Sequence, residues 1–147
     1  METIGIDFGT TNSVLAYWDT SGSHLIHIDD LPVAWAPYGF EGVFPTVMAK
    51  DDSERLTFGW EAKTKGVGTF NAVKRLFATQ SDIALNNEGE AIDVEEVATM
   101  LFAEMRRRAL ASGVDANSAI VTVPANSKGR ARHRTKVCAG MAGFEVL

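Results

Sequence analysis

The chain has 147 residues, a hydrophobic content of 46% and a formal net charge of −5. This composition suits one globular domain or part of a larger one, and no apolar run approaches the roughly 18 residues that a membrane-spanning helix requires. The first residues lack the basic and apolar segments of a secretory signal, and the single cysteine, Cys138, cannot form an internal disulfide, so we expect a cytoplasmic protein.

Three strands are predicted before residue 30. β-Branched residues at alternating positions predict a strand over residues 3–8, and apolar residues predict further strands over 13–18 and 25–28. The joint at residues 9–12 is short enough for a hairpin, and residues 19–23 have the composition of a turn. We therefore expect an antiparallel meander whose first tip projects from one end of the sheet.

The middle of the chain is predicted to be less regular. Residues 29–44 contain two prolines and two glycines and are expected to form a loop. Short strands are expected over 44–50 and 56–59, followed by short helices over 60–65 and 69–78. The apolar face of the second of these helices is expected to consist of Phe70, Val73, Leu76 and Phe77.

The last third of the chain gives the clearest helix, over residues 93–112, where apolar residues repeat at i, i+3 and i+4. Asp93 can cap its first turn, with Glu96 at the capping-box position. A strand over 119–125, a helix over 127–142 and a final short strand follow. This order of strands and helices indicates a layered α/β domain.

The end of the first strand carries Asp7, although a core strand has no use for an unpaired charge. Gly9 lets an anion approach the backbone closely, and Thr10 and Thr11 add hydroxyl groups that can bind phosphate oxygens. A carboxylate beside phosphates requires a cation, and Asp7 can hold Mg²⁺ through the waters that this ion usually keeps. The alternative is a plain turn, in which Asp7 is a cap and the threonines only favour β structure.

Four stretches of the sequence resemble one family. Residues 4–13, IGIDFGTTNS, resemble the first phosphate motif of the superfamily of actin, sugar kinases and heat-shock chaperones. Residues 72–78 (AVKRLFA) and 119–126 (AIVTVPAN) are similar to chaperone segments, and 132–147 (RHRTKVCAGMAGFEVL) resemble the chaperone motif A-T-K-x-A-G-x-x-A-G-L-E-V. Because all four occur in family order, the chain resembles the N-terminal part of the nucleotide-binding domain of the DnaK-type, seventy-kilodalton heat-shock protein family.

The resemblance implies an α/β architecture with the actin-like ATPase (ribonuclease-H-like) fold, of which this chain would be the N-terminal lobe. Residues of about 1–40 and 115–147 would form the core ribonuclease-H-like subdomain, and about 41–114 a small inserted upper subdomain. Only about fifteen residues separate the AVKRLFA segment from the helix at Asp93. We therefore expect a divergent member with a short upper subdomain.

The resemblance also implies a bound ATP or ADP with Mg²⁺. Asp7 would lie beside the waters of Mg²⁺, and Lys74 matches the family lysine that contacts the γ-phosphate and orients the attacking water. Without the resemblance, Lys74 is a solvated helix lysine. The residues that would line the phosphates are Gly9, Thr10, Thr11 and Asn12.

Pro124 and Arg132 match a proline and an arginine that, in this family, relay the nucleotide state to another domain. Asn126 and Ser127 stand where the family usually has an aromatic pair, so the contacts that connect this relay are expected to differ.

By resemblance, the parent protein would couple ATP hydrolysis to the binding and release of unfolded polypeptide. Its other partners would be a J-domain co-chaperone and a nucleotide-exchange factor. The family's next segment does not appear before Leu147. The chain is therefore expected to be a piece of a longer protein and not to hydrolyse ATP by itself.

Other functions stay open at this point. A small-molecule kinase, such as a sugar kinase, and a filament-forming actin relative share the phosphate motif. A nucleic-acid module is suggested by residues 106–147, which hold eight basic and two acidic residues. However, the basic residues between 128 and 136 alternate at i, i+2, which spreads charge around a helix, so we expect a solvated or phosphate-facing helix and neither nucleic acid nor membrane as a partner.

Several remaining residues are expected to be structural. The three histidines have no ligand spacing, so no zinc site is expected. Cys138 is interpreted as a small core residue. The residues interpreted as packing anchors are Trp18, Trp35 and Trp60.

Overall fold

A computed structural model describes residues 2–79 and 81–147. The N-terminal meander is confirmed: β1 (Glu2–Phe8), β2 (Asn12–Asp19) and β3 (Gly22–Leu25) pair in antiparallel order. The third strand begins and ends earlier than predicted, because the turn between β2 and β3 is tighter than its composition indicates. Ile26 and Ile28 lie beyond β3, but both are buried, and the Ile26 amide still donates to the Leu15 carbonyl.

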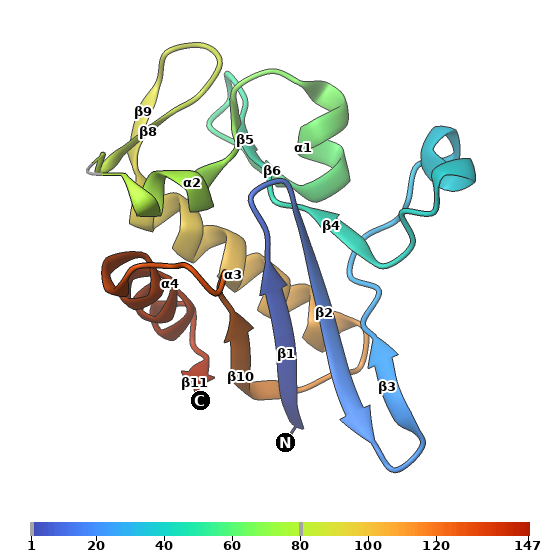
Figure 1. The fold of residues 1–147 in the computed structure, drawn as a ribbon. Helices are drawn as coiled ribbons and strands as arrows, with labels where there is room; N and C mark the ends of the chain where they lie inside the picture. The colour runs from blue at the N-terminus through green and yellow to red at the C-terminus, as the bar shows by residue number, and fades with distance from the viewer. Residues whose placement is uncertain (1, 80) are drawn as a thin grey trace.

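The meander forms one half of a six-stranded mixed sheet (Figure 1), with β3 at an edge. The strand β10 (Ala116–Thr122) pairs with β1 in parallel, and β11 (Glu145–Val146) continues the sheet in parallel beside β10. The sequence places β10 a few residues too late, at 119–125. The sheet order is β11-β10-β1-β2-β3, with β4 (Val43–Pro45) paired to β2.

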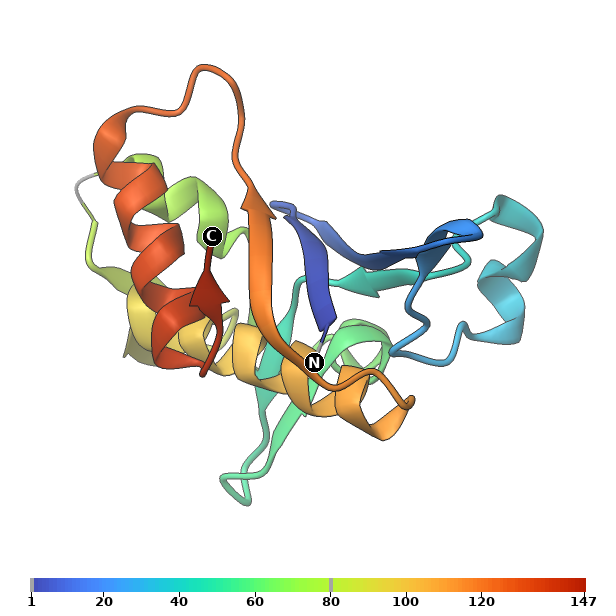
Figure 2. The same cartoon turned by 90° about the horizontal axis from the view of Figure 1, so that it is seen from below.

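The segment predicted as a loop over 29–44 is more ordered than expected. It contains the 3-10 helix η1 (Val33–Tyr38) and the first part of β4. Pro37 lies inside η1, and prolines had argued against regular structure in the sequence. Figures 1 and 2 show η1 projecting from the molecule at the end opposite α4 (Gly129–Met141).

A second region lies above the tip of the β1–β2 hairpin (Figure 1). The single strand predicted over 44–50 is two strands, β4 and β5, and the predicted helix over 69–78 begins late, because its first residues pair with β5. The hairpin of β8 and β9 was not predicted. The elements of this region are β5 (Met48–Lys50), β6 (Leu56–Phe58), α1 (Gly59–Lys65), β7 (Thr69–Phe70), α2 (Val73–Ala78), β8 (Ile83–Leu85) and β9 (Ala91–Asp93).

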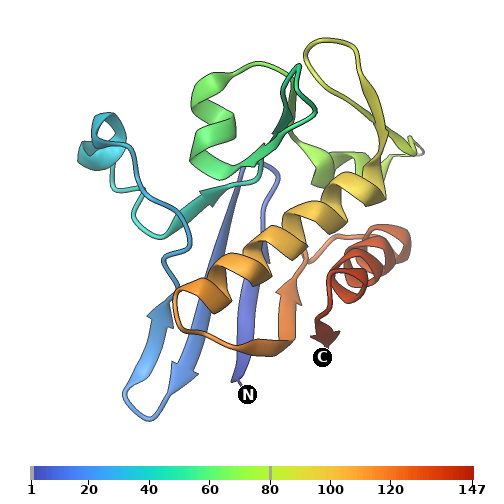
Figure 3. The same ribbon diagram turned by 180° about the vertical axis from the view of Figure 1, so that it is seen from behind.

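The long helix α3 (Val94–Ala111) crosses one face of the main sheet (Figure 3). The predicted cap is confirmed, because the Asp93 carboxylate accepts hydrogen bonds from the amides of Glu95 and Glu96. Leu101 and Phe102 pack in one hydrophobic core with the inward-facing residues of β1 and β2, which are Ile4, Ile6, Phe8 and Leu15. The helix α4 lies beside α3 and α2 and also contributes to this core.

Alternation along β1 determines which side chains face the core. Ile4, Ile6 and Phe8 are fully buried, whereas Asp7 faces the opposite, exposed side of the sheet. Cys138 and Trp60 are buried as predicted, but Trp18 is 76% exposed and anchors nothing. Within residues 2–79 and 81–147, no helix is both long and apolar enough to span a membrane.

Candidate phosphate-binding site

Asp7 lies at the C-terminal end of β1, where Thr122 of β10 is its partner in the parallel register. Both side chains are on the exposed side of the sheet, and the Thr122 hydroxyl donates a 2.8 Å hydrogen bond to Asp7 Oδ1. This bond fixes one carboxylate oxygen and leaves the other free of any hydrogen bond to a described residue. Asp7 is therefore an oriented, solvent-accessible carboxylate and not a core residue.

The hairpin tip after Asp7 needs glycine at its first position. A Cβ atom at Gly9 would lie 1.9 Å from the backbone oxygen of Asn12, closer than any real contact. The far side of the tip is held by Thr46, whose amide donates to the Thr11 carbonyl (2.9 Å) and whose hydroxyl bonds the Ser13 hydroxyl (2.7 Å). The tip is thus a tight and anchored turn.

Asn12 contributes an unusual feature to the tip. Its side-chain oxygen Oδ1 is buried and has no hydrogen-bond partner among the described residues. A buried acceptor without a donor is costly, so such an atom indicates an interaction that the protein chain does not itself supply.

Lys74 on α2 reaches across to β1, and its ammonium group donates a hydrogen bond to the carbonyl of Phe8. Burial lowers the pKa of the Lys74 ammonium, and the negative charge of Asp7 opposes that shift. A lysine that was ambiguous in the sequence is thus half-buried and brought beside the end of β1. This is the placement that a phosphate-contacting cation requires.

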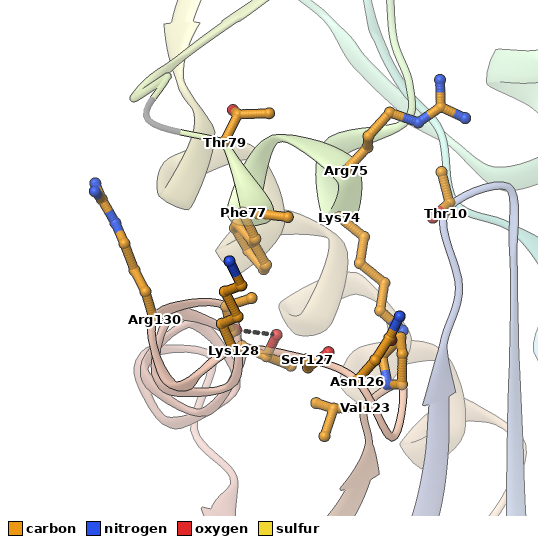
Figure 4. A pocket seen from close by; sticks show the side chains of 14 residues that line it. Thr10, Lys74, Arg75, Phe77, Thr79, Val123, Asn126, Ser127, Lys128 and Arg130 are labelled. Carbon is orange, nitrogen blue, oxygen red and sulfur yellow. Dashed lines mark hydrogen bonds between the residues drawn. The ribbon is translucent and has the colours of Figure 1, made fainter.

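A cavity of about 510 Å³ opens between α2 and the segment after β10 (Figure 4). Thr10, Lys74 and Pro124 line it together, so the structure brings these three predicted site residues to one place. The cavity wall also includes Asn126 and Ser127, which stand where the related motif has aromatic residues. Further cations line the cavity, namely Arg75, Lys128 and Arg130.

A second, smaller cavity of about 250 Å³ also borders the tip. Thr10 and Arg75 line both cavities, and Thr11 lines the second. The hairpin tip therefore lies between two hollows, which leaves its hydroxyl groups accessible on both sides.

Arg132 is not part of this arrangement. It is exposed on α4 and does not line the cavity that contains Pro124. The two residues predicted to act in one relay are therefore on adjoining elements but not in one site.

The donor set fits the phosphate end of a magnesium nucleotide. The described residues contain no cluster of three or more carboxylate, histidine or cysteine side chains, so they do not form an all-protein metal cage. A single oriented carboxylate, at Asp7, is what a largely hydrated Mg²⁺ needs. The hydroxyl groups of the tip, the Lys74 ammonium and the rim of cations are suited to phosphate oxygens.

Thr122 is a site residue that the sequence did not reveal. The hydrophobic pattern predicts that β10 is a strand, but only the register of its pairing with β1 shows that Thr122 lies opposite Asp7. Thr46 was missed for the same reason, since its contacts join positions 33 to 35 residues apart.

The basic excess after residue 105 is largely engaged within the fold. Arg106 bonds the Asn117 side chain, Arg107 and Arg108 pair with Glu104, and Arg108 also pairs with Asp29. On α4, Arg130 pairs with Asp82, and Arg134 pairs with Asp82 and Glu95. The other basic residues of this segment, Lys128, Arg132 and Lys136, are exposed and follow one another at a spacing of four residues. The expectation that all basic residues of this helix are solvated is wrong for Arg134, which is buried.

The sequence is similar to curated chaperones over nearly its whole length. It is 32% identical to the chaperone protein DnaK of Mycoplasmopsis agalactiae over 98% of this chain and 23% of that protein. It is 29% identical to DnaK of Halobacterium salinarum over 97% of this chain and 22% of that protein, and 28% identical to DnaK of Mycoplasmopsis pulmonis over 98% and 23%. The chain thus spans about a quarter of the length of these relatives. No protein-family model matches the chain.

Proposed function

This chain is a homologue of the DnaK-type, seventy-kilodalton heat-shock chaperones over nearly its whole length, and on that premise we propose that it binds the phosphate end of ATP or ADP together with Mg²⁺. The observation that carries the proposal is the convergence of Asp7, Thr10 and Lys74 at one end of β1. Homology indicates the family, and this geometry supports the proposed chemistry.

Each residue has a defined role in this proposal. Asp7, oriented by Thr122, accepts hydrogen bonds from the waters of Mg²⁺. The tip from Gly9 to Asn12 cradles the β- and γ-phosphates with its backbone amides and its two threonine hydroxyls. The Lys74 ammonium offsets negative charge on the terminal phosphate and orients the attacking water. Bound Mg²⁺ neutralises phosphate charge and polarises the phosphoryl oxygens.

We further propose the actin-like, ribonuclease-H-like fold for the domain to which this chain contributes its N-terminal lobe. The mixed sheet with β1, β2 and β3 in antiparallel order and β10 and β11 in parallel supports this assignment. The core subdomain would include residues of about 1–40 and 115–147, and the inserted upper subdomain those of about 41–114. The short hairpin of β8 and β9 is consistent with a trimmed upper subdomain.

Chaperone activity is proposed for the whole protein and not for these 147 residues. The parent would couple ATP hydrolysis to the binding and release of unfolded polypeptide, with a J-domain co-chaperone and a nucleotide-exchange factor as partners. Pro124, at the rim of the cavity, and Arg132, exposed on α4, would relay the nucleotide state. We place the protein in the cytoplasm, since Cys138 is a free, buried thiol.

Amide chemical shifts measured during titration with millimolar Mg·ADP test the proposal, because NMR detects weak binding. We expect shifts confined to the amides of residues 8–12, 74, 122, 123 and 125–127. Asp7→Asn should weaken the Mg²⁺-dependent part of the binding, whereas the matched control Asp52→Asn, at an exposed turn, should not. If saturating nucleotide leaves the amides of the tip unmoved, the proposal is wrong.

A further inference from the structure

A buried arginine on α4, Arg134, packs against α2, the helix that carries Lys74. Arg134 is only 4% exposed, although it belongs to a helix whose other basic residues are exposed. In the motif that residues 132–147 resemble, the corresponding position is alanine. A buried guanidinium at this point therefore requires its own explanation, since burying a charge is costly unless it is paired.

The guanidinium group of Arg134 joins three parts of the fold to α4. Its Nε donates a 2.8 Å hydrogen bond to Glu95 in the first turn of α3, and its Nη2 lies 3.4 Å from Asp82 in the segment before β8. The centre of the guanidinium is 5.2 Å from the centroid of the Phe77 ring on α2. Phe77 is 1% exposed, so this cation–π contact is desolvated, the condition under which such contacts are strongest.

One further atom makes the ring contact important. Arg134 Nη1 is buried without a hydrogen-bond acceptor among the described residues. Since no acceptor compensates this nitrogen, the electron-rich face of Phe77 adds to the stabilisation that the carboxylates of Glu95 and Asp82 give to the cation.

The helix α2 depends on such contacts from outside. It has only six residues, its N-cap residue Ala72 has a left-handed φ of 54°, and no side chain caps its first turn. A helix of this length is not stable by itself, so its position is determined by what it packs against. Phe77 follows Lys74 by three residues on α2, so a contact that fixes Phe77 also fixes the helical turn from which Lys74 extends to Phe8.

We propose that Arg134 is a positioning residue, which holds α2 against α4 through Phe77 and thereby keeps Lys74 at the end of β1. In this chain the coupling between the lysine helix and α4 passes through Arg134, while Arg132, two residues earlier, is exposed. The consequence for nucleotide rests on the proposed function, but the positioning of α2 does not.

Hydrogen exchange of the protein without nucleotide tests the positioning directly. Arg134→Met keeps the length and apolar stem of the side chain and removes the charge. Asp82 and Glu95 are 65% and 41% exposed at their side chains, so water can solvate them in this variant. We expect exchange of the α2 amides to rise about tenfold while the amides of β1 and β10 keep wild-type rates. Arg132→Met is the matched control and should change neither set.

A second variant removes the other partner. Phe77→Leu keeps an apolar residue in the core but loses the aromatic face, and it should raise exchange of α2 to a similar extent. In the double variant, exchange of α2 should be only slightly faster than in the faster single variant, because each substitution removes the same contact between residues 134 and 77. Acylation of Lys74, measured by mass spectrometry against the exposed Lys136, should become faster in both single variants.

These measurements separate positioning from general stability. Wild-type exchange of α2 in Arg134→Met would contradict the proposal. Equal acceleration of α2, β1 and β10 would also contradict it, because the arginine would then stabilise only the whole fold. Additive effects in the double variant would show that Arg134 and Phe77 act separately. A failure of Mg·ADP to shift the hairpin tip would overturn the proposed function and leave this result unchanged.

Discussion

Thr122 Oγ1 lies 2.8 Å from Asp7 Oδ1, on the neighbouring parallel strand and on the same exposed side of the sheet. The bond gives the charged side chain of Asp7, on the outer face of β1, a fixed orientation. A carboxylate that must meet ordered waters benefits from such an arrangement, because less freedom is lost on binding.

Removing the Thr122 hydroxyl should therefore weaken magnesium-dependent nucleotide binding. We expect Thr122→Val to reduce the affinity for Mg·ADP roughly three- to tenfold, the equivalent of one hydrogen bond. Thr122→Ser restores the hydroxyl and should restore the affinity. The Mg²⁺ dependence of the amide shifts gives the measurement, and equal affinities for the valine and serine variants would exclude this role.

Gly9→Ala tests the tightness of the hairpin tip. The added Cβ would meet the Asn12 oxygen at 1.9 Å, so the backbone must move. We expect a loss of about 1–3 kcal/mol in the free energy of unfolding, measured with urea, and loss of the shifts that nucleotide causes at the tip. Gly140→Ala is the control, since a Cβ there has open space on α4, and it should stabilise the protein by about 0.5–1 kcal/mol.

The lowered pKa of Lys74 predicts a pH dependence of stability. Folding disfavours the charged ammonium, so between the folded pKa and the ordinary value of 10.5 the unfolded chain binds more protons. The contribution of Lys74 to the free energy of unfolding therefore rises with pH across this window. In urea unfolding between pH 8 and 10.5, the free energy of unfolding of the wild type minus that of Lys74→Met should become more positive as the pH rises. A flat difference, or the same trend in Lys136→Met, would contradict the prediction.

The Cys138 thiol should be unreactive in the folded protein. Burial raises its pKa to about 11, so little thiolate exists near neutral pH, and the group is buried against α3. A colourimetric thiol reagent at pH 8 should label the protein only at the rate at which it unfolds, and labelling in urea should be fast. Rapid labelling of native protein would show that this face of α4 opens locally.

The Asp93 cap should contribute measurably to stability. Its Oδ1 accepts from the Glu95 amide at 2.9 Å and from the Glu96 amide at 3.2 Å. Asp93→Ala should lower the free energy of unfolding by about 1 kcal/mol, as measured with urea. The exposed Asp52→Ala serves as the comparison and should be close to neutral.

Local patterns in the sequence predicted the parts of the fold that depend on nearest neighbours. The alternating β-branched residues indicated the strand β1, and the helical repeat and Asp93 indicated the start of α3 within one residue. The cost of burying a charge indicated that Asp7 is not a core residue, and its side chain is exposed. These features need no knowledge of distant residues.

Features that depend on distant pairing were not predictable in the same way. Phe70 was expected on the apolar face of a helix, but Thr69 and Phe70 pair with β5, because an open edge of that strand is available. The alternating charges of α4 indicated a solvated helix, yet Arg134 is buried because its partners Glu95 and Phe77 come from other elements. Local sequence patterns do not indicate that those partners lie next to Arg134, because tertiary packing brings them together.

The Asp7–Thr122 bond joins residues 115 positions apart. During synthesis at roughly 5–20 residues per second, about 6–23 seconds pass after Asp7 is made before Thr122 exists. Through that interval the β1–β2 hairpin lacks its parallel neighbour, and the backbone edge of β1 that β10 later covers stays open. The oriented carboxylate is consequently among the last features of this region to mature, because all residues of the meander are made well before Asp7 can gain its hydrogen-bond donor.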